Sequence, residues 1–235
     1  MTNNGISRIV EIVGVAGVGK TTLCQVLSQG NKAIHLSDFP DVRKISNVPF
    51  FIRNSIQISP TLFKISQHNS RKLTRREFVW LSILNGWPDV LQKELKNNQA
   101  IILDQGPVYL FAEISEFGPE FLKRQEAEKM WRDLYSRWAD TLDMIVWLDA
   151  PDADLLKRIR SRDKEHVVKN ESVDTTFEFL AGFRKAYEQI ISNLSANHKN
   201  LKILRFDTSQ KSPQEISGFR QFRFYRNRSR HRLPT

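Results

Sequence analysis

The feature that most constrains the fold of this chain is a glycine-rich segment, GVAGVGKTT, at residues 14–22. It directly follows a short β-branched run, RIVEIVG at residues 8–14, which is typical of a buried strand in a parallel sheet. Its spacing fits GxxxxGK[ST], in which glycines let successive backbone N–H groups turn inward around phosphate groups. The helix that follows adds the positive end of its dipole. The segment therefore predicts a phosphate-binding loop between a first strand and a first helix.

Each polar residue at the end of this loop has a predicted task. Lys20 would bridge the β- and γ-phosphates of a nucleoside triphosphate, the Thr21 hydroxyl would coordinate Mg²⁺, and Thr22 would lie near the α-phosphate. We expect ATP as co-substrate, with GTP left open, and Mg²⁺ as cofactor. The expected nucleotide contacts are Gly14, Val15, Ala16, Gly17, Val18, Gly19, Lys20, Thr21 and Thr22. The alternative is a glycine-rich turn that only joins strand to helix.

Strand and helix signals alternate along the rest of the chain. Apolar runs typical of strands recur at residues 33–37, 100–103, 144–148 and 201–206, and helical spacing occurs at residues 21–28, 75–96, 120–138, 153–161 and 175–194. This alternation predicts a three-layer α/β fold with a five-stranded parallel sheet and ligands at the carboxyl ends of the strands. Residues 39–72 contain Pro40, Pro49 and Pro60, so we expect helix pieces and loops there, with substrate contacts.

The length of 235 residues predicts one core domain, residues 1–211, followed by a basic tail, residues 212–235. No apolar run approaches the length of a membrane span, and the polar start lacks the regions of a secretion signal, so we expect a cytoplasmic protein without membrane contact. A disulfide within the chain is excluded because Cys24 is its one cysteine, and the spacing of the five histidines predicts no structural metal.

The net charge of +10 is concentrated at the end of the chain. Six arginines without an acid lie in residues 219–235: Arg220, Arg223, Arg226, Arg228, Arg230 and Arg232. Aromatic residues between them suit single-stranded nucleic acid. The favoured interpretation is a solvated tail without fixed structure, and nucleic-acid binding is the alternative.

Two aspartates follow predicted strands. Asp104 ends the run IILD and resembles the Mg²⁺-holding aspartate that accompanies such phosphate loops, although an aspartate that caps the next helix is the alternative. Asp38 follows the second strand, and we expect it to orient and deprotonate an acceptor hydroxyl or, for a phosphate acceptor, to order Mg²⁺ or water. The alternative for Asp38 is a conformational role in a turn.

The richest internal basic cluster, LLKRIRSRDK, lies directly behind the fourth strand. Arg158 and Arg162 are four residues apart and share one helix face, whereas Arg160 points elsewhere. We expect residues 158–173 to form a lid whose arginines offset charge on the transferring phosphate, with its mobile tip at residues 166–172. A solvated charged helix face is the alternative.

These motifs resemble the thymidylate kinase and deoxynucleoside kinase branch of P-loop kinases. The resemblance covers residues 8–208 and depends on GVAGVGKTT, on IILDQG, and on LLKRIRSRD followed by FRKAYEQI. It implies the sheet order 2-3-1-4-5. It also implies that Arg158 lies near the adenine, that Arg162 lies near the transferring phosphates, and that Asp207 and Thr208 border the adenine.

The chain departs from these kinases where they present arginines to the acceptor. The third strand ends in Asp104-Gln105-Gly106, where these kinases have an arginine. In the helix before that strand, LNGW at residues 84–87 occupies the place of a second arginine of the family. A monophosphate acceptor is therefore doubtful, although Arg71, Arg75 and Arg76 can supply charge. The predicted acceptor contacts are Asp38, Arg75, Arg76 and Gln105. Trp80 and Trp87 can stack on a ring, but core packing is the favoured interpretation.

Together these features predict an ATP-dependent phosphotransferase that acts on a small acceptor, either a nucleoside, a nucleotide or another metabolite. The predicted catalytic residues are Lys20, Asp38, Arg158 and Arg162, and the predicted metal ligands are Thr21 and Asp104. Two alternatives stay open: a polynucleotide-end kinase that uses the basic tail, and a nucleotide-operated switch without a second substrate. A homodimer is also left open.

Overall fold

The fold is built on one five-stranded sheet. The structure, a computed structural model, describes residues 8–29, 31, 33–67, 71–163, 165–197, 200–219 and 222. The strands are β1 (Arg8–Val13), β2 (Ile34–Ser37), β3 (Ala100–Leu103), β4 (Met144–Asp149) and β5 (Lys202–Asp207). They are parallel and lie in the order β2-β3-β1-β4-β5. The predicted fold class and strand order are confirmed.

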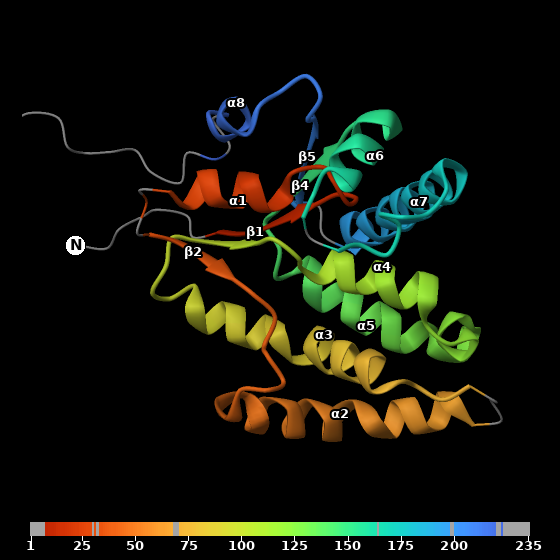
Figure 1. Cartoon of the computed structure of the whole chain (residues 1–235). Helices are drawn as coiled ribbons and strands as arrows, with labels where there is room; N and C mark the ends of the chain where they lie inside the picture. Colours follow the sequence, from red (N-terminus) through yellow and green to blue (C-terminus); the bar gives the residue numbers. More distant parts are fainter. Residues whose placement is uncertain are drawn as a thin grey trace, which may run out of the picture.

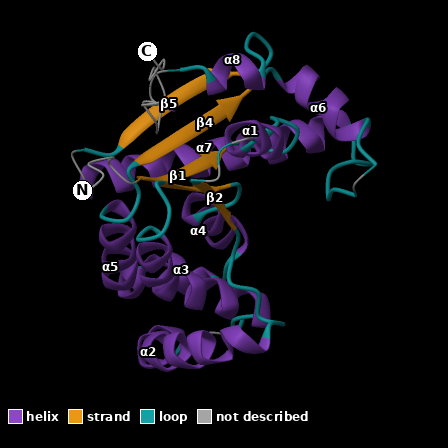
Figure 2. Ribbon diagram, turned by 90° about the vertical axis from the view of Figure 1, so that its left-hand side faces the viewer, coloured by secondary structure: helices purple, strands orange, loops and turns teal. Residues whose placement is uncertain are grey.

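Helices cover both faces of this sheet. They are α1 (Lys20–Ser28), α2 (Val48–Ser66), α3 (Arg75–Glu94), α4 (Pro107–Phe117), α5 (Glu128–Ala139), α6 (Asp152–Arg160), α7 (Val173–Asn197) and α8 (Pro213–Ser217). The chain moves across the sheet in one direction from β1 to β2, and in the opposite direction from β2 to β3, from β3 to β4 and from β4 to β5. Because these crossovers are right-handed, α1 lies on one face of the sheet, and α3, α4, α5 and α7 lie on the other. Figure 1 shows this division, with α8 beside α1. In Figure 2, α2 is the helix farthest from the sheet, outside α3.

Apart from Glu11 on β1, the interior residues of the central strands are apolar on both faces, as expected when helices cover both. Val10 of β1 pairs with Ile102 of β3 and with Met144 of β4 in the middle of the sheet, and all three are completely buried. This burial fixes the carboxyl ends of the three strands relative to one another. No helix in the described part of the chain is both long and apolar enough to cross a lipid bilayer.

The helical layer beyond the sheet differs from the prediction in three places, one of which is α4, for which no helix was expected. Residues 48–66, expected as pieces, form one helix: Pro49 lies in its first turn, where no N–H is needed, and Pro60 lies inside it on the exposed side. The helix expected at 120–138 is wrong in its first part, because short 3-10 turns, Glu120–Lys123 and Gln125–Ala127, precede α5.

The start of the predicted tail belongs to the folded body. Ser212 and Glu215 form a capping box for α8, and Ile216 is buried. The rings of Phe219 and Phe222 lie 4.8 and 6.5 Å from that of Phe206 on β5. The six tail arginines, Arg220, Arg223, Arg226, Arg228, Arg230 and Arg232, lie outside the described residues.

Candidate active site

The glycine-rich loop has the backbone of a phosphate cradle. Gly14, Gly17 and Gly19 have φ angles of 152°, 87° and 92°, a region that favours glycine. A Cβ on Gly14 would lie 2.3 Å from the carbonyl oxygen of Leu148 on β4. Because α1 begins at Lys20, its N-terminal N–H groups open onto the loop. The loop therefore depends on glycine both for its backbone angles and for its close approach to β4.

The ammonium group of Lys20 lies within this loop. Its Nζ donates to the carbonyl oxygens of Gly14, at 2.7 Å, and of Val15, at 3.2 Å. Burial lowers the pKa of Lys20 to about 8, opposed by the charge of Asp104 and assisted by that of Arg162. A phosphate group bound there would favour the charged form and raise this pKa again.

Thr21 and Asp104 present oxygen atoms side by side. The Thr21 hydroxyl donates to Oδ2 of Asp104 at 2.7 Å, and Oδ1 of Asp104 is buried without a hydrogen-bond partner among the described residues. In the described part, no group of three or more His, Cys, Asp and Glu residues is arranged to hold a metal. Mg²⁺ commonly takes only one or two carboxylates together with phosphates and water. The unpartnered oxygen and the adjacent hydroxyl fit such an ion.

A cavity of about 730 Å³ extends from the loop to the helical layer. Its loop end is formed by Gly14, Val15, Ala16, Gly17, Gly19, Lys20, Thr21, Asp104 and Gln105. Its other end, which we name the acceptor end, is formed by Arg76, Tyr109, Glu113, Phe179, Phe183 and Tyr187, from α3, α4 and α7. Arg162, Glu165, His166 and Val167 also line the cavity, behind α6. One continuous space thus connects the phosphate loop to a charged and aromatic wall.

The acceptor end has ordered polar groups. The Tyr109 hydroxyl donates to Oε1 of Glu113 at 2.6 Å. The guanidinium of Arg76 lies 4.2 Å from the ring centre of Trp80, a cation–π contact that orients it. Arg76 was predicted from the sequence, whereas Tyr109 and Glu113 were not, because α4 was not expected as a helix.

A second cavity, of about 380 Å³, lies beside the loop and is lined by Thr22, Arg158, Arg162 and Thr208 among others. Arg158 donates from Nη1 to Oγ1 of Thr208 at 2.9 Å and from Nη2 to its carbonyl oxygen at 3.1 Å. Arg162 lines both cavities, whereas Arg160 donates to the Glu171 carbonyl. The structure therefore brings Thr22, Arg158, Arg162 and Thr208 together.

The remaining predicted residues lie elsewhere. Asp38 and Arg75 are exposed and line neither cavity. Asp207 accepts from the backbone and hydroxyl of Ser209, and these hydrogen bonds lower its pKa. Arg71 pairs with Glu77 at 2.6 Å. Trp87 is buried and meets Phe39 and Trp138 edge to face, as core packing predicts.

Glu11 of β1 is a fully buried carboxylate that the sequence analysis did not identify. It accepts from the backbone N–H groups of Gly106 and Val108, both at 3.1 Å, and of Tyr109 at 3.3 Å. Burial raises its pKa to about 8, although the three N–H groups act in the opposite direction. The sequence feature that could have identified Glu11 is that it is the one charged residue inside the apolar run RIVEIV. Glu11 caps α4 and fixes the backbone between Asp104 and Tyr109.

The start of α6, which leads into the predicted lid, is fixed by Arg184 on α7. Its guanidinium contacts Asp149 at 3.0 Å, at the end of β4, and Asp152 at 2.6 Å, in the first turn of α6. Nη2 also donates to the Ala150 carbonyl at 3.0 Å. These contacts hold the start of α6, so Arg158 projects from an anchored helix. Arg162 follows the end of α6 at Arg160, so the expectation that Arg158 and Arg162 share one helix face is wrong.

Comparisons with known proteins agree with this geometry. A family model described as "AAA domain" matches residues 10–178. No curated protein sequence matches the chain. Thymidylate kinase from Candida albicans is similar in structure, with 17% identity and a TM-score of 0.52 over 90% of this chain and 88% of that one.

Deoxyadenosine kinase from M. mycoides is also similar. With bound dATP it has 16% identity and a TM-score of 0.47 over 89% of this chain and 95% of that one. With the products dCMP and dCDP it has the same identity and TM-score, over 88% and 93%. The family match spans well over half of the chain, and the thymidylate kinase likeness supports the same architecture. The chain belongs to the AAA domain family of P-loop proteins, and its fold is similar to that of thymidylate kinase.

Proposed function

We propose that the protein transfers the γ-phosphate of Mg-ATP to a small acceptor with a planar ring, a nucleoside or a related metabolite. The observation that carries this proposal is the continuous cavity of about 730 Å³ between the phosphate loop and the acceptor end. A nucleotide-operated switch needs only the loop end. A second compartment lined by Arg76, Tyr109 and Glu113 supports a second substrate.

The nucleotide would lie across the loop. The N–H groups of the loop and of the first turn of α1 would bind its phosphates, and Lys20 would exchange two carbonyl partners for phosphate oxygens. The base would occupy the smaller cavity, beside Thr208 and Arg158. Thr21 and Asp104 would hold Mg²⁺, which supplies positive charge to the phosphates when bound.

Arg162 is the proposed catalytic arginine of the lid. It lines both cavities, as Gly17 and Gly19 of the loop do, so it lies beside the space proposed for the phosphates. A guanidinium there would stabilise negative charge that spreads onto the transferring phosphoryl group. The contacts of Arg184 with Asp149 and Asp152 support this role because they orient α6.

The acceptor end favours a neutral ring over a monophosphate. Phe179, Phe183 and Tyr187 offer apolar surface to a ring. Within the described lining, Arg76 is the one arginine or lysine outside the phosphate loop and the lid. A single exposed guanidinium with an adjacent carboxylate, Glu113, suits hydroxyl and ring nitrogen groups better than a dianion.

Two carboxylates are candidates to accept the proton of an acceptor hydroxyl. Asp38, expected from the sequence, is exposed outside the cavity lining, whereas Glu113 lies within it. We therefore expect Glu113→Gln to lower kcat/KM for the acceptor more than Asp38→Asn. A larger loss for Asp38→Asn would return the role to Asp38 and imply that the segment after β2 closes over the acceptor.

The test is a transfer assay with Mg-ATP labelled in its γ-phosphate and a panel of nucleosides, nucleoside monophosphates and sugars. We expect a labelled product with a nucleoside and none with Lys20→Ala. Lys157→Ala, an exposed change on α6, is the matched control. Hydrolysis of ATP without a labelled acceptor from any member would contradict the proposal and favour a switch.

A further inference from the structure

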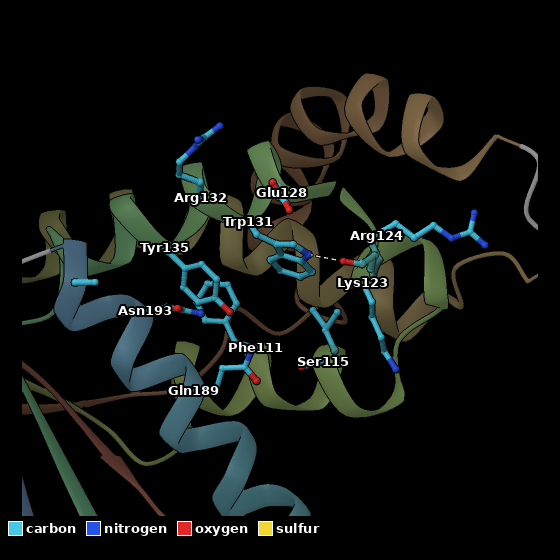
Figure 3. A pocket seen from close by; sticks show the side chains of 13 residues that line it. Phe111, Ser115, Lys123, Arg124, Glu128, Trp131, Arg132, Tyr135, Gln189 and Asn193 are labelled. Atoms are coloured by element: carbon cyan, nitrogen blue, oxygen red, sulfur yellow. Dashed lines mark hydrogen bonds between the residues drawn. The ribbon is translucent and has the colours of Figure 1, made fainter. Parts of the chain in front are cut away.

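A separate cavity of about 580 Å³ lies between α4, α5 and α7 (Figure 3). It shares no lining residue with the cavity at the phosphate loop. Its volume falls in the usual range of small-molecule sites, about 300 to 1,000 Å³. The proposed phosphate transfer makes no use of it.

One wall of this cavity is a set of fixed aromatic rings. Phe111 and Tyr135 are stacked with centroids 4.5 Å apart, and Trp131 lies 5.9 Å from Phe111. The indole N–H of Trp131 donates to the Leu122 carbonyl at 2.6 Å, the bond drawn in Figure 3. The ring packing and this hydrogen bond hold the aromatic side chains in place. A planar ring can therefore stack on them with little loss of side-chain entropy.

The opposite side carries groups that recognise polar atoms. Gln189 and Asn193 of α7 face the rings in Figure 3, and a side-chain amide can both donate and accept. The Asn193 amide already hydrogen-bonds the Tyr135 side chain, so the exposed Gln189 amide is the one that suits the edge of a ring that bears nitrogen or oxygen atoms.

The rim of the cavity is basic. It carries Lys123, Arg124 and Arg132 against one acid, Glu128. Lys123 pairs with Glu120 at 3.0 Å, whereas Arg124 and Arg132 have no ion pair within the described residues. Both arginines extend outward to solvent in Figure 3, and as exposed side chains they can turn toward an anion at the mouth. A negatively charged group on the ligand would offset this charge.

We propose that this cavity binds a small planar aromatic molecule that carries an anionic group, at a site distinct from phosphate transfer. The ring would lie against Trp131 and Tyr135, and the anion would meet Arg124 and Arg132 at the mouth.

A ligand there would affect the acceptor end, because α4 and α7 form walls of both cavities. On α4, Tyr109 and Glu113 face the acceptor end and Phe111 and Ser115 face the second cavity. On α7, Phe183 and Tyr187 face the first and Gln189 and Asn193 the second. A shift of either helix on binding would therefore change the acceptor wall. This consequence rests on the proposed function, whereas binding itself does not.

The binding test uses 2-naphthyl phosphate and measures quenching of tryptophan emission in the presence of saturating magnesium tripolyphosphate, which would occupy the phosphate loop and has no ring. We expect saturable quenching that is lost in Trp131→Phe, and weaker saturation with 2-naphthol, which lacks the anion. Inorganic phosphate should not compete at the same concentration, because it lacks the ring.

Variants at the rim keep the fold and test the anion contact. Arg124→Gln combined with Arg132→Gln should weaken binding roughly tenfold, since each exposed charge contributes modestly. Lys129→Gln, an exposed change on α5 outside the lining, is the matched control and should bind like the unchanged chain. Gln189→Ala, also exposed, should weaken binding without affecting the fold. Absence of saturable binding, or equal binding by the double arginine variant, would overturn the proposal.

The coupling test measures the KM of the acceptor with and without 2-naphthyl phosphate. We expect a change in this KM for the unchanged chain and none for the double arginine variant. Saturable binding without any change in KM would refute the coupling alone. Failure of the transfer reaction itself would leave the quenching result in place, so the two failures are distinguishable.

Discussion

The two ends of the main cavity are built in opposite ways. The loop end consists largely of consecutive residues, and its geometry comes from backbone angles at Gly14, Gly17 and Gly19. The acceptor end gathers single side chains from three helices spread between Arg76 and Tyr187. A function performed by backbone leaves a short motif in the sequence, whereas one performed by distant side chains depends on how the helices pack.

The first prediction removes the charge of the loop end. Lys20→Ala should lower kcat about a thousandfold, because the ammonium is buried among groups that would meet phosphate. Single-turnover transfer assays measure this. Lys157→Ala should retain activity, and a loss of less than tenfold for Lys20→Ala would show that the loop end does not position the phosphates as proposed.

The second prediction concerns the junction between the two ends, which Glu11 fixes. Its folded pKa of about 8 lies above the ordinary value of 4.5, so the folded state holds the proton more tightly between these pH values. The free energy of unfolding should therefore fall as pH rises through this window, by up to about 1.4 kcal/mol per pH unit.

Urea unfolding of the unchanged chain and of Glu11→Gln from pH 5 to 8 measures this contribution. The slope should be flatter in Glu11→Gln, and Glu116→Gln, an exposed change on α4, the helix that Glu11 caps, should keep it. Identical slopes in all three proteins would mean that Glu11 is ionised in the folded state throughout this range.

The third prediction concerns the pH dependence of ATP binding at the loop end. Because the pKa of Lys20 in the empty loop is about 8 and a bound phosphate raises it, ATP affinity should be highest below pH 8. It should fall about tenfold between pH 7 and pH 9 as the empty loop loses its proton. Calorimetry near pH 8.5 in buffers of different ionisation heat should show proton uptake on ATP binding. The absence of proton uptake would refute the role of Lys20 in binding the phosphates.

The fourth prediction tests the acceptor end with neighbouring arginines. Arg76→Ala should raise the KM of the acceptor about fivefold and leave that of ATP unchanged, because the guanidinium lines the acceptor end but is exposed. Arg75→Ala is the control, since Arg75 lines neither cavity. If Arg76→Ala and Arg75→Ala raised the KM of the acceptor equally, the effect would come from the loss of positive charge and not from a contact between Arg76 and the acceptor.

The parts of the fold that could be predicted are those with local signals. The apolar runs identified every strand to within a residue or two, and the glycines predicted a loop whose positive φ angles the structure contains. The roles of Lys20, Thr21, Asp104 and Arg162 remain predictions, although the structure brings these residues to one cavity.

The parts that could not be predicted depend on contacts between distant residues. Helix α4 has no side-chain cap of its own, because Glu11 on β1 supplies the carboxylate that its N–H groups need. Tyr109 and Glu113 were missed with that helix. In α2, Pro60 could be recognised as harmless only once its turn was known to face solvent.

The hydrogen bonds from Lys20 to Gly14 and Val15 have a consequence for how a nucleotide arrives. These bonds hold the ammonium against the loop backbone, on the side where a phosphate would bind. A nucleotide that binds would replace these two carbonyl groups as partners of Lys20 and would not have to order a flexible loop. The loss of backbone conformational entropy on binding should therefore be small. Arrival should accordingly depend on displacing water and those two carbonyls, and not on refolding of the loop.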